Sequence, residues 1–277
     1  MALVRRERIL ILAKTYPSPS AKHVETSCVA GICENGSMRR LYPVPFRMIE
    51  QDQQFKKWQW IEVGVEKAPA DHRPESHRVD IGSLKVAEKV TTQDKWAQRR
   101  EWIDKMPTFT SFDEIQRACK DEQMSIALLR PKQVLGLEIK DARSKDWTAD
   151  EKEKLMRAQM QGDLFSEAQA KQQVKELRKV PYDFYYSYVF DTPQGEQRCT
   201  HKIVDWEAGA LFWHVFREHG PTGWKEKFRA KLEEDLIKKD LMFLMGNQHR
   251  FQDQWLIISL IYPPKQALVD TRQGSLF

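Results

Sequence analysis

The stretch ETSCVAGICENGSMRRLYPV, residues 25–44, decides the fold of the N-terminal part of this chain. Its first nine residues form a largely apolar run, and residues 38–44 form a second extended segment. Between them lies Asn35-Gly36, a dipeptide that favours the two-residue turn of a β-hairpin. The stretch therefore predicts two antiparallel strands joined by a tight turn.

Runs with strand character lie on both sides of this hairpin. Arg8 to Tyr16 is an apolar run that ends in Pro-Ser-Pro, and Trp58 to Val65 alternates between apolar and polar residues. A loop is expected around residues 72–75, and a further strand over Leu84 to Val90. We therefore predict an antiparallel β-barrel or half-barrel over residues 1–110.

The middle of the chain, residues 111–180, is predicted to be mainly helical. Three helix starts are marked by a serine or threonine followed three residues later by a glutamate or glutamine, a spacing that lets the two side chains cap the helix. These pairs are Ser111 with Glu114, Thr148 with Glu151, and Ser166 with Gln169. The last helix must end before Pro181, and a pair of short strands is expected over 126–129 and 134–139.

Residues 181–277 change character again and predict a C-terminal module. Aromatic residues alternate along one strand face over 182–190, a turn follows, and residues 198–204 return as a second strand. Two helices come next, the first capped by Asp205, and strands over 242–245 and 255–262 close the module. This ββααββ order makes the whole chain an α+β protein.

The composition is that of a folded intracellular protein. Of the 277 residues, 41% are hydrophobic and 31% are charged, with nine tryptophans, which indicates packed cores rather than disorder. The four cysteines form no disulfide framework, no apolar run is long enough to cross a membrane, and the first residues predict a strand rather than a secretion signal. We expect a cytoplasmic protein without a membrane partner.

The net charge of +5 is unevenly distributed. Residues 1–110 carry 19 Lys and Arg against 14 Asp and Glu, whereas the remainder carries 26 of each. The positive excess therefore lies in the first part, which favours a phosphate-facing surface there. An ordinary basic surface explains the same numbers.

Residues 25–44 also resemble a segment of prokaryotic dual-OB-type proteins, which are found among DNA-modification and phage-defence genes. The shared pattern is Cys28-x-Ala-Gly31-Ile, the turn glycine Gly36, an arginine at Arg39, and Pro43-Val44. This sequence lacks the aromatic residue expected just before the arginine. The resemblance implies an OB-like β-module. The residues that it places on or beside the sheet face that binds single strands by charge and stacking are Arg39, Arg40, Tyr42 and Arg47.

A pentapeptide occurs twice, as Gln161-Gly-Asp-Leu-Phe165 and as Gln273-Gly-Ser-Leu276-Phe277. Both copies resemble the bacterial sliding-clamp-binding motif Gln-x-(Asp/Ser)-Leu-Phe. In such a peptide the Leu and Phe side chains enter an apolar pocket while the Gln amide makes directional hydrogen bonds. The resemblance assigns clamp binding to Gln273, Leu276 and Phe277, whereas the internal copy can equally pack the two helices that it joins.

Four residues near the second C-terminal strand are candidates for catalysis, namely Cys199, His201, Asp205 and Glu207. A thiol, an imidazole and carboxylates can bind a metal or act as nucleophile and base, with Cys28 and Cys33 as further members if the fold brings them near. The alternation of Cys199 and His201 is also that of an ordinary core strand. One such enzyme would hydrate a nitrile on a 7-deazaguanine base in DNA, since gene clusters for that modification encode a nitrile-hydrating enzyme.

The segment Val134-Leu-Gly-Leu-Glu138-Ile-Lys140 resembles the Glu-x-Lys strand of PD-(D/E)xK nucleases. In those enzymes carboxylates hold a divalent metal and the lysine supports the attacking water. Asp121 is the only nearby upstream carboxylate that the spacing favours as a companion. The sequence contains no Walker A, Rossmann glycine, HExxH or GxSxG motif, which weakens nucleotide-driven and common hydrolase functions.

These features together predict a prokaryotic protein that binds DNA, works with other modification or defence proteins, and contacts the sliding clamp. An enzyme that acts on a nucleobase in DNA, or a nuclease, is the alternative. The sequence names no cofactor and no metal.

Overall fold

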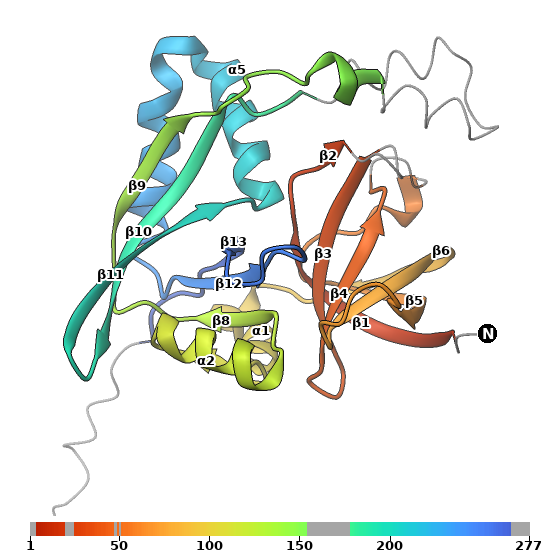
Figure 1. The fold of residues 1–277 in the computed structure, drawn as a ribbon. Helices are drawn as coiled ribbons and strands as arrows, with labels where there is room; N and C mark the ends of the chain where they lie inside the picture. Colours follow the sequence, from red (N-terminus) through yellow and green to blue (C-terminus); the bar gives the residue numbers. More distant parts are fainter. Residues whose placement is uncertain (1–3, 20–24, 47–48, 50, 154–177, 267–277) are drawn as a thin grey trace, which may run out of the picture.

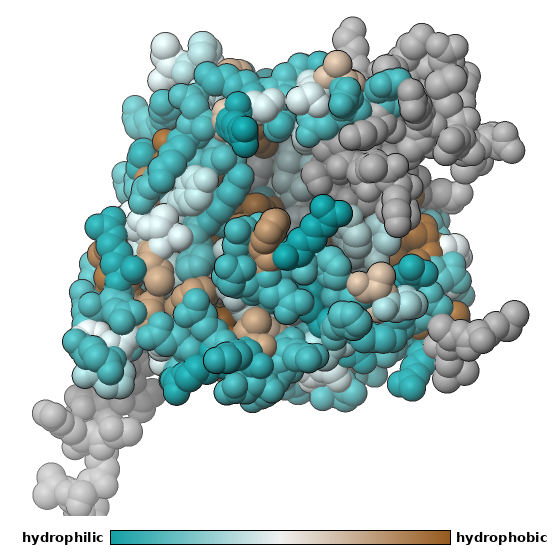
Figure 2. Space-filling view, in the orientation of Figure 1, coloured by the Kyte–Doolittle hydropathy of each residue, from teal (hydrophilic) through white to brown (hydrophobic). Residues whose placement is uncertain are grey.

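The computed structural model describes residues 4–19, 25–46, 49, 51–153 and 178–266 of the chain (Figure 1). The described strands form two sheets, an N-terminal barrel and a C-terminal sheet, and the buried apolar residues gather in three clusters. One cluster fills the barrel, one lies between the barrel and the second sheet, and one lies between the second sheet and the helices on its other side. Figure 2 shows a mainly hydrophilic surface on the face in view, with hydrophobic residues in small separate patches.

The first sheet closes into a five-stranded barrel. Its strands are β1 (Arg5–Lys14), β3 (Glu25–Cys33), β4 (Met38–Val44), β5 (Gln59–Lys67) and β6 (Ser76–Lys89), and the short β2 (Ser18–Pro19) pairs with β3. The order around the barrel is β1-β5-β6-β4-β3 and back to β1, with β4 and β6 parallel and the other pairs antiparallel. This is a five-stranded Greek-key barrel of the OB type, so the predicted OB-like module is confirmed.

The β3–β4 hairpin has the bounds that its sequence predicts. Gly36 at the turn has a φ of +84°, which glycine adopts without steric cost. Gly31 is needed for a different reason, because a Cβ atom there would lie 2.5 Å from the carbonyl oxygen of Leu10 on the paired strand. The last barrel strand, β6, begins at Ser76 and is therefore longer than predicted.

Strand β1 is apolar throughout its second half because it has a core on each side. Ile9 and Ile11 point into the barrel, whereas Leu10 and Leu12 point out of it, and all four are fully buried. The outward cluster is completed by residues of the second sheet, namely Ile126, Leu128, Met242, Leu244, Ile258 and Ile261. A continuous apolar run is the pattern expected of a strand covered on both faces.

The second sheet has the strand order β7-β8-β12-β13-β11-β10-β9. These strands are β7 (Thr108–Phe109), β8 (Ile126–Leu129), β9 (Gln133–Asp141), β10 (Tyr182–Thr192), β11 (Gly195–Ile203), β12 (Met242–Asn247) and β13 (Trp255–Ile261). The helices are α1 (Gln93–Ile103), α2 (Phe112–Glu122) and α5 (Trp206–Arg229), which continues into η2 (Ala230–Asp235), and η1 (Gln51–Gln53) follows β4.

Helix α5 consists of two segments that meet at Gly220, where φ is +69° and Pro221 follows. The predicted pair of helices is therefore present between the β10–β11 hairpin and the β12–β13 pair. Both the ββααββ order of the C-terminal module and the α+β class are confirmed.

Two features of residues 93–141 differ from the prediction. Residues 126–129 and 133–141 are strands, as expected, but they do not pair with each other: β8 pairs with β12, and β9 pairs with β10. Both strands thus belong to the C-terminal sheet. Helix α1 and strand β7 were not predicted at all, and the division of the chain at residues 110 and 180 stays a prediction.

Of the predicted capping pairs, Thr148 with Glu151 forms in full, and in the first pair the Ser111 side chain caps α2 without a described bond to Glu114. The Ser111 hydroxyl accepts the Asp113 N–H at 3.1 Å at the start of α2. The Thr148 N–H donates to the Glu151 carboxylate at 2.7 Å, and the Glu151 N–H donates to the Thr148 hydroxyl at 3.2 Å, which is a reciprocal capping box. The third predicted pair, Ser166 with Gln169, lies outside the described residues.

The edge strand β9 is protected by two side chains from η2 and the end of α5. The Leu137 N–H donates to the Glu233 carboxylate at 2.6 Å, and Arg229 donates to the Leu137 carbonyl at 2.8 Å. Arg229 and Glu233 also form an ion pair with each other at 2.7 Å. The pair occupies the positions that a further strand would use, which blocks edge-to-edge association.

Replacing Glu233 by alanine is expected to cause concentration-dependent self-association, because the Leu137 N–H becomes available to a second molecule. The same change should lower the free energy of unfolding by about 1–2 kcal/mol, because it removes a hydrogen bond to a charged group. Sedimentation velocity over a protein dilution series measures the first effect. The neighbouring exposed Glu234, replaced by alanine, is the control, and equal monomer fractions for both variants would contradict the protective role.

Candidate functional site

The usual ligand face of an OB-fold is covered by the second sheet in this protein. OB-folds bind oligonucleotides on the face of their second and third strands and through the neighbouring loops. Those strands are β3 and β4 here. Ala30 and Ile32 on the outer face of β3 are fully buried in the cluster shared with the second sheet. This face therefore serves as an intramolecular interface.

Arg40 is part of that interface and not of the surface. It is 3% exposed, and its guanidinium donates to the Ser125 carbonyl at 2.7 Å and to the Ser125 hydroxyl at 3.2 Å. The Glu75 carboxylate accepts the Ser125 N–H at 2.9 Å and the Ser125 hydroxyl at 2.7 Å. We name Arg40, Glu75 and Ser125 the junction network. The prediction that Arg40 contacts nucleic acid is corrected by this burial.

The other predicted nucleic-acid residues are placed differently. Arg39 makes a two-pronged ion pair with Glu7 at 2.7 and 2.9 Å, and hydrogen bonding to this guanidinium lowers the pKa of Glu7. Tyr42 is 46% exposed, so its ring is accessible. Arg47 lies outside the described residues. Of the four, only the Tyr42 side chain is described as exposed.

Both barrel loops that border an OB ligand face also contact the C-terminal part. In the loop between β5 and β6, Arg73 donates to the Asn247 carbonyl at 2.8 Å. In the loop after β1, the Tyr16 N–H donates to the Val204 carbonyl at 2.9 Å, and a Cβ atom on Gly209 would lie 2.4 Å from the Tyr16 ring. The described parts of the barrel's ligand face and of both loops thus help to hold the second sheet, whereas Tyr42 on β4 stays exposed.

The predicted catalytic residues Cys199 and His201 lie together on β11, but their environment does not activate them. The His201 ring nitrogen Nδ1 shares a hydrogen bond with the Tyr188 hydroxyl at 2.9 Å, and its ring packs against Phe112. Burial lowers the pKa of His201 to about 4 and raises the pKa of the Cys199 thiol. A neutral thiol beside a weakly basic imidazole is a poor nucleophile and base pair.

Asp205 and Glu207 serve a structural purpose at the start of α5. The Asp205 carboxylate is 4% exposed, accepts the N–H groups of Glu207 and Leu260 at 2.7 and 3.0 Å, and lies 3.8 Å from the Lys57 ammonium. Glu207 is half exposed and faces the same ammonium at 3.4 Å. No described contact joins these carboxylates to Cys199 or His201, and the described residues contain no cluster of three or more metal-binding side chains.

The remaining cysteines do not join such a site. Cys28 contacts the Arg40 guanidinium at 3.4 Å, and the Cys33 thiol donates to Glu7 at 3.5 Å, so both face partners within the barrel. Burial raises the pKa of Cys33 to about 12. Neither thiol is poised to react or to bind a metal with Cys199.

The burial of His201 predicts a loss of stability in acid. The neutral imidazole is favoured in the folded state, so the stabilisation is complete above the ordinary pKa near 6.5 and disappears as the pH falls toward about 4. We expect the free energy of unfolding to fall by about 2 kcal/mol more between pH 6.5 and 4 in the native protein than in His201→Gln. Urea unfolding at several pH values measures it. His214→Gln, at a side chain that is 68% exposed, should leave the native profile unchanged.

The nuclease-like segment forms an exposed ion pair. Lys140 lies 2.9 Å from the Glu138 carboxylate, which also accepts the Ser187 hydroxyl at 2.6 Å. The residue opposite Lys140 on β10 is Asp183, which pairs with Lys202 at 2.7 Å, whereas the expected companion Asp121 is on α2. Each charged group of this strand face therefore has a structural partner. Both clamp-like pentapeptides lie outside the described residues.

A surface that the sequence reasoning missed lies where β9 ends, β10 begins and α5 passes (Figure 1). Three cations there lie over aromatic rings: Arg178 over Trp213 at 5.6 Å, Lys179 over Trp147 at 4.9 Å, and Lys225 over Tyr182 at 5.7 Å. Two more exposed arginines, Arg143 and Arg217, belong to the same stretches of chain, Arg143 just after β9 and Arg217 on α5. We name these eight residues the cation–aromatic rim.

The rim has an excess of positive charge. The carboxylates nearby are held by other lysines, Asp141 by Lys145, Asp146 by Lys152 and Glu226 by Lys227. The hydrogen bond to Lys152 lowers the pKa of Asp146, and the nearby charge of Lys179 adds to this, so Lys179 has a carboxylate neighbour although no described ion pair joins the two. The other four rim cations form no ion pair with a described residue. The hydrogen bond from the Ala142 N–H to the Pro181 carbonyl and the Tyr182–Trp224 ring contact of 4.7 Å bring the rim together from three separate stretches.

The fold and these surfaces define an α+β protein in which an OB-like barrel is joined through its ligand face to a seven-stranded sheet. The chain belongs to the family described as Domain of unknown function (DUF8757), whose model matches residues 108–277. A second model, Domain of unknown function (DUF8758), matches residues 5–105, so the two matches meet between α1 and β7. No curated protein matches the chain.

A solved structure of a replication protein A heterotrimer bound to ssDNA aligns with this chain at 10% identity and a TM-score of 0.25. The alignment covers 94% of this chain and 66% of that chain. A likeness this weak carries no argument about function. Within the described residues, no helix is both long and apolar enough to cross a membrane.

Proposed function

We propose that this protein binds single-stranded nucleic acid on the cation–aromatic rim as part of a prokaryotic DNA-modification or phage-defence pathway. The observation that carries the proposal is the set of five cations, none of which forms an ion pair with a described residue and three of which lie over aromatic rings. The pathway rests on the resemblance of residues 25–44 to proteins of such gene clusters.

The chemistry of the rim suits a single strand. Lysine and arginine neutralise backbone phosphates, while tryptophan and tyrosine rings give stacking surfaces for bases, and together these two terms account for most sequence-independent binding of single strands. Trp213 and Tyr182 are half-buried at the edge of the core cluster. The barrel contributes by holding the C-terminal sheet in place.

The test is the binding of labelled single-stranded DNA, duplex DNA and RNA across a salt series. The expected result is binding of single strands that weakens steeply with salt. Replacing Arg178, Lys179 and Lys225 together by alanine should make the slope of log K against log salt shallower by about 2, since each phosphate neutralised on a single strand contributes about 0.7. The size of this change reports how many phosphates the three cations neutralise, and so tests whether the rim is the binding surface.

The matched control is Lys132→Ala. Lys132 lies just before β9, at the opposite end of this strand from the rim, and contacts the β10–β11 hairpin. Lys132 is half exposed and pairs with Asp191 and Glu196, so its removal should leave the salt slope unchanged. Absence of binding by the native protein at low salt would exclude direct nucleic-acid contact. Equal slopes for the native and triple-variant proteins would exclude the rim.

We propose further that the C-terminal pentapeptide Gln273-Gly-Ser-Leu276-Phe277 tethers the protein to the sliding clamp. Support comes from the match of these residues to the clamp-binding pattern. Surface plasmon resonance with immobilised bacterial clamp should give saturable binding that the double change Leu276→Ala and Phe277→Ala abolishes. Retention of binding by this variant would refute the tether while leaving the rim proposal untouched.

A further inference from the structure

Strand β6 departs from its partner β5 at a wide bulge. The register passes from Glu62 opposite Lys85 to Gly64 opposite Asp80, so four residues of β6, 81–84, lie opposite the single residue Val63 of β5. The bulge is ordered by its own side chains: the Ser83 hydroxyl accepts the Gly64 N–H and donates to the Asp80 carbonyl, both at 2.7 Å. Bulges of this kind occur preferentially beside functional sites because they redirect side chains.

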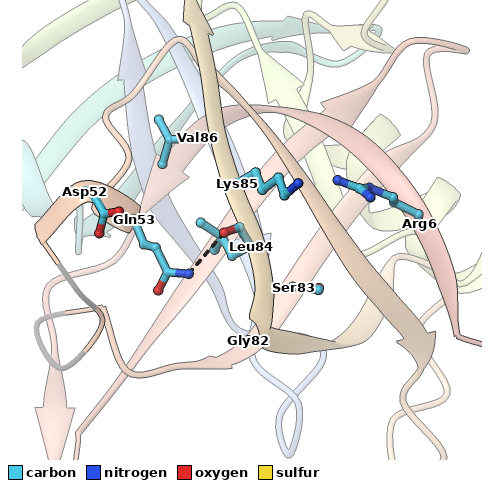
Figure 3. Close-up of a pocket in the computed structure, with 8 residues that line it drawn as sticks. All are labelled: Arg6, Asp52, Gln53, Gly82, Ser83, Leu84, Lys85 and Val86. Carbon is cyan, nitrogen blue, oxygen red and sulfur yellow. Dashed lines mark hydrogen bonds between the residues drawn. The ribbon is translucent and has the colours of Figure 1, made fainter.

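The bulge forms one wall of a hollow of about 500 Å³ on the free side of the barrel (Figure 3). Gln53 on η1 donates to the Leu84 carbonyl at 3.1 Å, which fixes the η1 side of the hollow. In Figure 3 the side chains of Arg6 and Lys85 extend on one side of β6 and bring their charged ends toward each other, while Asp52 and Gln53 lie on the other side.

The Arg6 and Lys85 side of the hollow carries an excess positive charge. Arg6 is 59% exposed and pairs with Glu62 at 3.0 Å, an exposed pair that exchanges readily with solvent ions. Lys85 is exposed, and no described carboxylate forms an ion pair with it. Two cations therefore face one carboxylate, Glu62. Among the described residues, Asp52 is the only carboxylate that lines the hollow itself.

We propose that this hollow binds a phosphate ester, with the guanidinium of Arg6 and the ammonium of Lys85 as the charged partners. A guanidinium offers paired donors and an ammonium offers a point charge, a combination suited to a doubly charged phosphate. Asp52 and Gln53 supply acceptors for the hydroxyl or amino groups of the attached organic part. The hollow is on the barrel, apart from the rim, and does not depend on nucleic-acid binding there.

Isothermal titration with dAMP at low ionic strength is the first measurement, with deoxyadenosine as the ligand that lacks the phosphate. We expect dAMP to bind, deoxyadenosine not to bind, and Lys85→Ala to weaken dAMP binding about tenfold, as removal of a charge-assisted hydrogen bond implies. Glu62→Gln should strengthen it because the competing carboxylate is removed. Lys89→Ala, at an exposed lysine of the same strand outside the hollow, is the matched control and should change nothing.

The source of the phosphate is distinguished by a parallel titration with an unlabelled oligonucleotide. If dAMP fails to bind but Lys85→Ala weakens oligonucleotide binding and Lys89→Ala does not, the hollow takes a phosphate of a nucleic-acid strand. If dAMP binds with Lys85 dependence, it takes a small phosphate ester. The proposal is overturned if Lys85→Ala and Lys89→Ala behave alike with both ligands.

Discussion

Replacing Arg40 by methionine is expected to lower the free energy of unfolding by about 3 kcal/mol. Methionine keeps much of the aliphatic volume but removes the donors that satisfy the Ser125 carbonyl in a buried interface. It also removes the guanidinium charge that Ser125 links to the Glu75 carboxylate, which is 8% exposed. A buried polar group that loses its partner bears the full cost of desolvation, which exceeds the net value of the bond itself. Urea unfolding followed by tryptophan fluorescence measures the change.

Tyr42→Ala is the control for the Arg40 experiment, because Tyr42 lies two residues away on the same strand and is 46% exposed. Its loss should change the free energy of unfolding by no more than about 0.5 kcal/mol. If Arg40 contacted nucleic acid, the methionine variant would keep its stability and lose binding instead. That result would contradict the junction network and restore the interpretation drawn from the sequence.

The N-terminal barrel could be predicted because its signals are local. Asn35-Gly36 fixes a turn, and the residues on each side alternate into and out of the barrel, so both strands of the hairpin have their predicted bounds. Helix α1 was missed because its sequence lacks an apolar stripe, and the backbone at Asp94, Lys95 and Trp96 has positive φ values. Local patterns do not encode such a distorted start.

Strand partners depend on distant residues and could not be predicted in the same way. β8 and β9 are separated by three residues, which favours a hairpin, yet Leu129 pairs with Phe243 and Glu138 pairs with Tyr185. The apolar sequence of β8 fits a central strand, since all four of its residues are buried. The partner of a central strand is decided by the whole sheet.

The position of Arg40 illustrates how a site can be misjudged from sequence. Alternation correctly puts Arg40 and Tyr42 on the outer face of the barrel, but it says nothing of what covers that face. The missing signal was in β3, where Ala30 and Ile32 make the outer face apolar as well as the inner one. The rim escaped notice because its members come from stretches that are far apart in the sequence and adjacent only in the fold.

Asp205→Ala is expected to lower the free energy of unfolding by about 4 kcal/mol, the largest effect predicted for this chain. The change removes the cap of α5 and leaves the N–H groups of Glu207 and Leu260 without their acceptor. It also leaves the Lys57 ammonium, 7% exposed, with the Leu260 carbonyl, the half-exposed Glu207 and the Tyr262 ring as its described partners. Burial raises the pKa of Asp205 while the Lys57 charge opposes that rise. Each charge therefore lowers the free-energy cost of burying the other.

A double-mutant cycle distinguishes this account from a catalytic role for Asp205. Lys57→Met alone should cost about 3 kcal/mol because it strands the buried carboxylate. Asp205→Asn keeps one acceptor for the helix cap, and combined with Lys57→Met it should be more stable than the sum of the two single changes predicts, by about 1–2 kcal/mol. Additive effects would mean that the two charges do not interact. A coupling of this size, measured by urea unfolding without substrate, would show that Asp205 stabilises the contact between α5 and the barrel. A catalytic carboxylate would show its coupling in activity instead.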